Sequence, residues 1–218
     1  MINKLILFFL FNSIFVFSQD NFSKKEKLSF TISSTHLIDP FDGSSIRIGI
    51  EKPFDDFAVN LEFGKYINTI ENYNIKPNVK GFIFNPIIKV KINTNNKRVT
   101  EFAGIDYLYK VFSYDTQDSI KIAALIVNKE YRISRKVHAI SIKFMQRQYF
   151  NEHLFYEFYF GLGIRYTSSK SDLTAEEKEN ILNDEYHGAT QIENEINKTG
   201  NFIRPNLYCG VKFGYSIF

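Results

Sequence analysis

Eight stretches of this 218-residue chain alternate apolar side chains with polar or small ones at a period of two. Successive side chains of a β-strand point to opposite faces, so the alternation predicts strands that each have one apolar face. The predicted strands span residues 28–37, 45–52, 57–66, 81–92, 99–114, 137–150, 154–168 and 202–218. Their even number and their lengths, which bracket the roughly 9 to 11 residues that cross a bilayer at a tilt, suit a single-chain membrane barrel. We therefore predict an all-β fold, an eight-stranded antiparallel up-and-down transmembrane β-barrel.

The connections between the predicted strands alternate between two length classes. Residues 53–56, 93–98 and 151–153 form short connections, residues 67–80, 115–136 and 169–201 form long ones, and residues 38–44 are intermediate. Short periplasmic turns and long extracellular loops are typical of bacterial outer-membrane barrels. With eight strands, this order predicts an integral outer-membrane protein with both termini in the periplasm.

The two faces of the predicted strands differ in chemistry. The apolar face is predicted to meet lipid, and its representative residues are Ile48, Leu61, Phe63, Ile142, Phe160 and Phe213. Glycines and charges share the other face, which predicts a lumen polar network of Arg47, Glu51, Glu62, Asp106, Lys110, Lys143, Arg165 and Lys212. Eight strands enclose room for packed side chains only, so we expect a plugged lumen with paired charges. Tyr156 and Tyr215 near one rim, and Tyr109 and Tyr166 near the other, suggest interfacial girdles.

The amino terminus has the pattern of a secretory signal. Lys4 precedes an apolar run that ends at Ser18-Gln19-Asp20, which predicts a signal peptide over residues 1–18, cleaved between Ser18 and Gln19. The alternative is a retained anchor, but the run is shorter than the roughly 20 apolar residues of a spanning helix. A periplasmic segment, residues 19–27, and a barrel domain, residues 28–218, follow. Loss of Lys4 lowers the net charge from +3 to +2, which gives nucleic-acid binding no electrostatic basis.

The last predicted strand ends in Gly214-Tyr-Ser-Ile-Phe218. With the signal peptide, the eight alternating strands and the long outer loops, this ending resembles the small outer-membrane barrels of the OmpA, OmpX and OmpW kind over essentially the whole mature chain. The resemblance implies outer-membrane lipid as the surroundings and recognition of the last strand by the barrel-insertion machinery. The family ending has aromatic residues at alternate positions back from the terminal Phe, whereas here Phe213 and Tyr215 are out of phase with Phe218. This difference predicts a bulge or a frayed last residue.

Few residues suggest chemistry. The four histidines, His36, His138, His153 and His187, show no metal-ligand spacing, so no metal or cofactor is expected. Cys209 lies in an apolar strand and is expected to be a small hydrophobic residue. Some lipid-modifying barrels place a histidine and a serine near the outer leaflet, but His138 and Ser141 fall on opposite faces of one strand.

Thr174 and Glu177 have capping-box spacing and predict a short helix over residues 178–186 in the last long loop. Its apolar positions Ile181, Leu182 and Tyr186 are expected to pack on the barrel rim or to meet a partner. We expect a non-enzymatic barrel with an envelope structural role or surface recognition through its loops, with an unknown extracellular or envelope partner. The alternatives are a lipid-modifying enzyme, a narrow passage for small or apolar solutes and, third, a soluble lipocalin-like carrier.

Overall fold

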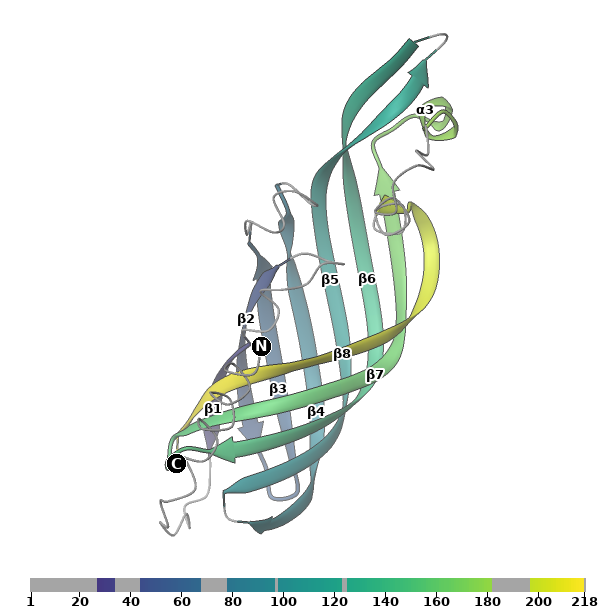
Figure 1. Cartoon of the computed structure of the whole chain (residues 1–218). Coiled ribbons are helices and arrows are strands. Elements are labelled where there is room, and N and C mark those ends of the chain that lie inside the picture. Colours follow the sequence, from purple (N-terminus) through teal and green to yellow (C-terminus); the bar gives the residue numbers. More distant parts are fainter. Residues whose placement is uncertain are drawn as a thin grey trace, which may run out of the picture.

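Eight antiparallel strands follow one another in sequence order around a closed barrel (Figure 1). The computed structural model describes residues 27–33, 44–67, 78–96, 98–122, 125–181 and 197–217. The strands are β1 (Leu28–Ser33), β2 (Ser45–Pro53), β3 (Phe57–Tyr66), β4 (Lys80–Asn96), β5 (Val99–Ile122), β6 (Leu125–Tyr149), β7 (Leu154–Ser171) and β8 (Gly200–Ile217). The pairing of β1 with β8, from Leu28↔Ile217 to Ser33↔Lys212, closes the ring. The predicted eight-stranded up-and-down barrel is confirmed.

The two ends of the barrel differ. Short connections at residues 54–56, 97–98 and 150–153 lie at one end, which we call the short-turn end. Leu28 and Ile217 pair with each other at this same end. The other end has the long connections and is called the hairpin end, because β5 and β6 extend far beyond the barrel there (Figure 1).

The predicted long loop over residues 115–136 is wrong, because residues 115–122 and 125–136 are strand. β5 and β6 pair without a break from Val99↔Gln148 to Ile122↔Leu125, whereas β4 pairs with β5 only as far as Ser113. Cross-strand polar pairs hold the projecting part together: Tyr131 donates to Asp118, and the Ser119 hydroxyl donates to Asn128 Oδ1 at 2.7 Å. The polar sequence was interpreted as loop, although its side chains pair across the hairpin.

The observed ends of other elements differ from the predicted ends by fewer residues. β4 continues over residues 93–96, predicted as a turn, and absorbs the additional residues as register shifts against β5. The capping box of Thr174 and Glu177 is present, but helix α3 spans only Ala175–Glu179 and ends at Asn180 instead of residue 186. The predictions on Ser18, Gln19, His36, Leu182, Tyr186, His187 and Phe218 lie outside the described residues.

Burial alternates with the predicted two-residue period in β2 and in β6 from Tyr131 to Arg147, whereas residues 125–128 at the hairpin tip are all exposed. The six residues predicted to face lipid all lie on the outer face, where their exposed fractions range from 40% for Leu61 to 62% for Ile48. Inward-facing side chains are buried over the length of the barrel, and they include Arg147, Lys89 and Lys212. Within the described part of the chain, no helix is long and apolar enough to cross a membrane.

Candidate functional site

Four charged side chains from four strands form a compact network inside the barrel near the short-turn end. Arg147 of β6 contacts both Glu51 of β2, at 2.7 Å, and Glu157 of β7, at 2.9 Å. Lys89 of β4 contacts the same two carboxylates, each at 2.7 Å. The two cations and the two carboxylates therefore alternate, and each charge has two opposite charges beside it. Buried charges need such compensation, because removing them from water costs several kcal/mol per ion.

A second group continues the network along the lumen. Lys212 of β8 forms an ion pair with Glu62 of β3 and lies 3.6 Å from Glu157, so it links the two groups. Lys143 of β6 lies with its ammonium 4.2 Å from the centre of the Tyr159 ring. The side chains in these ion pairs are at most 2% exposed.

Aromatic rings fill the space around these charges. The Arg147 guanidinium lies 3.9 Å from the centre of the Phe155 ring, and the Lys89 ammonium lies 4.3 Å from that of Phe102. Cations over ring faces gain most when they are desolvated, as they are here. This packing obstructs the lumen at the level of the network, and it holds the cations in fixed positions.

The sequence identified this network only in part. Seven of the eight predicted lumen residues are buried, and Arg165 is half-buried. The charges were expected to pair within this set; Lys212 does pair with Glu62, but Glu51 pairs with Lys89 and Arg147, which lie outside it. Lys89 was missed because Ile83 and Ile87 share the inner face of β4 and hide its polar character. Arg147 and Glu157 follow the alternation, which placed them on the charged face.

Toward the hairpin end the lumen also contains apolar side chains, beside buried charges such as Lys110 and Arg135. Phe112, Ile83, Leu108 and Val137 belong to one buried cluster there. The Tyr66 and Phe112 rings pack with their centres 4.9 Å apart. Leu173, just before α3, and Ile181, just after it, contact the same cluster, so the last loop covers this end of the core. Lys121 N donates to Asn180 O at 3.0 Å, which joins the loop to the projecting hairpin.

Aromatic side chains form a band on the outer face near each end of the barrel. At the hairpin end His138 accepts or donates a hydrogen bond with the Tyr107 hydroxyl at 2.7 Å, and its ring packs against Tyr109. At the short-turn end the His153 ring stacks on Tyr215, with ring centres 5.2 Å apart. Tyr156 and Tyr166 of β7 lie in opposite bands, ten residues apart, which is about 33 Å along a strand and about 25 Å along the axis of a barrel with a tilt near 40°. The band of apolar surface between them has the thickness of a bilayer interior.

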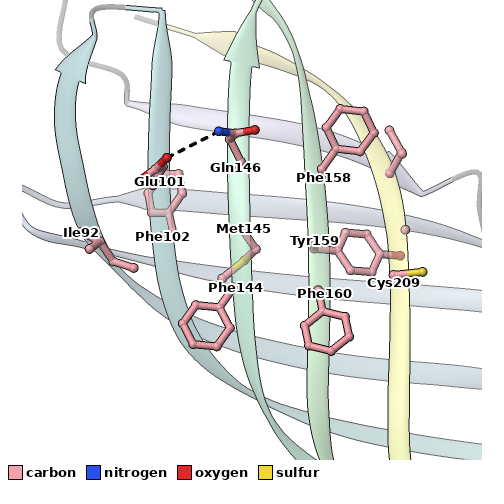
Figure 2. A pocket seen from close by; sticks show the side chains of 12 residues that line it. Ile92, Glu101, Phe102, Phe144, Met145, Gln146, Phe158, Tyr159, Phe160 and Cys209 are labelled. Carbon is pink, nitrogen blue, oxygen red and sulfur yellow. Dashed lines mark hydrogen bonds between the residues drawn. The ribbon is translucent and has the colours of Figure 1, made fainter. Parts of the chain in front are cut away.

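A shallow cavity of about 640 Å³ lies in this outer surface across β4 to β8 (Figure 2). Phe144, Phe158 and Phe160 project around it, and the small side chain of Cys209 leaves it open (Figure 2). At one edge Gln146 Nε2 donates to Glu101 Oε1 at 3.5 Å. The apolar lining suits a hydrocarbon chain.

The histidine and serine considered for catalysis do not meet. His138 lies in the outer aromatic band, whereas Ser141 is buried on the inner face and accepts a hydrogen bond from Asn206 Nδ2 at 3.0 Å. Their separation by the sheet agrees with the alternation of the strand.

A closed ring of eight antiparallel strands with an exposed apolar outer face has the architecture of the small membrane β-barrels, which the sequence resemblance implied. The sequence matches no protein-family model and no curated protein. Among solved structures, the crystal structure of the N-terminal β-barrel domain of Pseudomonas aeruginosa OprF matches with a TM-score of 0.42 and 8% sequence identity, over 88% of this chain and 100% of that one. The assignment of the fold rests on the strand order and registers of the chain itself.

Proposed function

We propose that this protein is an integral outer-membrane β-barrel with a closed lumen, and that it acts through the structures at its hairpin end. The observation that carries the proposal is the outer face, where large apolar side chains such as Ile48, Ile140 and Leu207 are more than 60% exposed between two aromatic bands. A monomeric protein in water rarely exposes so much continuous apolar surface. In a bilayer this surface faces lipid, and its cost in water disappears.

The arrangement argues against a soluble carrier. In a lipocalin-like barrel the apolar face lines a ligand cavity and charges face water. Here Glu51, Arg147 and Glu157 point inward and are buried, while the apolar residues point outward. The ion pairs and rings in the lumen also argue against a passage for solutes at this level.

The projecting hairpin supports a role in recognition. Nine residues of β5 extend beyond Ser113, the last residue paired with β4, which is a reach of about 30 Å. The tip exposes Ile122, Leu125 and Ile126, of which Leu125 is 70% exposed. Exposed apolar residues at the end of a paired strand ladder are suited to contact with a partner.

The separation of His138 from Ser141 supports the proposal of a non-enzymatic role. Catalysis by a histidine and a serine needs the two side chains within hydrogen-bonding reach, and the sheet separates His138 from Ser141. Replacement of His138 by Asn should therefore leave acyl-transfer or deacylation activity toward outer-membrane lipids at the background level of the wild type.

The proposal is tested on washed membranes. We expect the protein in the outer-membrane fraction, with an electrophoretic mobility in SDS that changes on boiling, because a closed membrane barrel unfolds only when heated. The purified barrel in planar bilayers should show no steady conductance. Recovery in the aqueous fraction with one mobility would contradict the membrane assignment, and a stable open conductance would contradict the closed lumen.

A further inference from the structure

Four lysines lie on the outer face at the hairpin end of the barrel, just beyond the aromatic band. They are Lys65 of β3, Lys80 of β4, Lys136 of β6 and Lys170 of β7, and all four are exposed. We call these residues the lysine patch. Lys136 lies two residues beyond His138 on the same face of β6, so the patch begins where the aromatic band ends.

The strand registers bring the four lysines together in two adjacent rows. One row runs from Lys65 through Phe82 and Val111 to Lys136. The next row runs from Lys80 through Ser113 and Ser134 to Lys170. Three strand spacings separate the ends of the second row, which is about 14 Å. Hydroxyl donors lie between the ammonium groups of this second row.

Two acids lie in the next row, Asp115 of β5 and Asp172 after β7. Asp115 accepts from Arg132 Nε at 2.8 Å and from Asn78 Nδ2 at 2.9 Å, and Asp172 Oδ1 accepts from Arg132 N at 2.9 Å. The described hydrogen bonds of these two carboxylates therefore go to Arg132 and Asn78 and to none of the four lysines. The outer face at the opposite end differs in charge, because it includes an acid. Glu101 is the only acid among the described outward-facing residues of the apolar band.

We propose that the lysine patch binds the phosphate groups of an anionic glycolipid in the leaflet at the hairpin end. This inference rests on the proposed membrane function and adds the chemistry of the lipid. Lysine stems lie along apolar surface while the ammonium groups reach the interface, where lipid phosphates are found. Serine hydroxyls in the same rows donate to phosphate or sugar oxygens. Each lysine near an anionic lipid surface contributes roughly fivefold in affinity.

The test compares two lipids and two variants of the full barrel by native mass spectrometry. The probes are lipid A and its dephosphorylated form. The variant K65Q/K80Q/K136Q/K170Q removes the patch, and K27Q/K52Q/K121Q/K178Q removes the same charge at four other exposed lysines. We expect the wild type to prefer lipid A, the patch variant to lose roughly tenfold or more in affinity, and the control to stay within about twofold of the wild type.

Three results would overturn the inference: equal loss in both variants, equal binding of the two lipids by the wild type, or inorganic phosphate bound as tightly as lipid A. A separate measurement isolates the proposed function. Folding of each variant into neutral phosphatidylcholine vesicles, followed by the heat-dependent change in mobility, tests the membrane barrel without any anionic lipid. A wild type that folds there but does not discriminate between the two lipids refutes the lipid site and leaves the membrane barrel intact.

Discussion

Replacement of Arg147 by Met tests whether the charge network lies in a dry lumen. Arg147 makes three hydrogen bonds to carboxylates: one to Glu51 at 2.7 Å and two to Glu157, at 2.9 and 3.2 Å. Methionine preserves much of the volume and the contact with Phe155, so the change chiefly removes the charge. Lys89 then remains as the one cation that contacts both carboxylates.

The expected cost follows from the burial of the pair. Removal of one partner of a buried ion pair costs about 3 to 5 kcal/mol, because the remaining charge has lost its compensation. With a urea dependence of about 2 kcal/mol per molar, the unfolding midpoint should fall by about 2 M. Substitution of Glu157 by Gln in the same molecule removes the uncompensated charge, so the double variant should be less destabilised than the sum of the single variants, by roughly 0.5 to 3 kcal/mol.

The assay is equilibrium unfolding by urea in lipid vesicles, followed by the change in gel mobility. Arg132→Met is the matched control, because it removes an arginine from an exposed ion pair. The Arg132 side chain, which pairs with Asp115, is 52% exposed. Its midpoint should remain close to that of the wild type. A loss of less than about 1 kcal/mol for Arg147→Met would mean that water reaches Glu51 and Glu157, and the closed lumen would be refuted.

Other perturbations probe separate parts of the molecule. Gly163→Ala should lower the urea midpoint more than Gly49→Ala. A Cβ added at Gly163 would lie 2.0 Å from the backbone oxygen of Ile140, whereas a Cβ added at Gly49 would meet the Thr31 side chain, which can rotate. Thr174→Ala should raise hydrogen exchange in α3 by an amount equivalent to about 1 kcal/mol through loss of the capping box, and unchanged exchange would argue against the cap. The hydrogen bond from Arg132 lowers the pKa of Asp115. The ionised Asp115 carboxylate therefore stabilises the hairpin fully above about pH 3.9, and this stabilisation is lost as the pH falls through the lowered pKa. The protection factors of the hairpin amides, which are corrected for intrinsic exchange rates, should therefore fall in acid in the wild type but not in D115N.

Much of the barrel could be predicted from a two-residue period, because one face of a membrane strand must be apolar throughout. The outer face therefore carried a clear signal, as in Ile46, Ile48 and Ile50. The projecting part of β5 and β6 carried none, since both of its faces mix polar and apolar residues outside lipid. Its strands exist because nine residue pairs form between them, from Tyr114↔Ile133 to Ile122↔Leu125, and such pairing cannot be seen in either segment alone.

The lumen was harder to predict for a related reason. A buried face tolerates either an ion pair or an apolar contact, provided that the partner across the barrel matches. Glu51 and Arg147 are 96 residues apart in sequence, and their contact depends on barrel closure. Phe112 of β5 and Tyr66 of β3 likewise meet as an apolar pair over β4, which lies between their strands. The partner of each residue is decided by the strand order and register, which no local pattern specifies.

The unbroken ladder between β5 and β6 has a mechanical consequence. The ladder pairs every residue from the short-turn end to the tip without a break. We therefore expect the two strands, about 80 Å long, to move as one unit. A load at Leu125 is passed along the strands to Phe102 and Arg147, which belong to the same two strands. A force on the hairpin tip would thus reach the charge network at the short-turn end of the barrel.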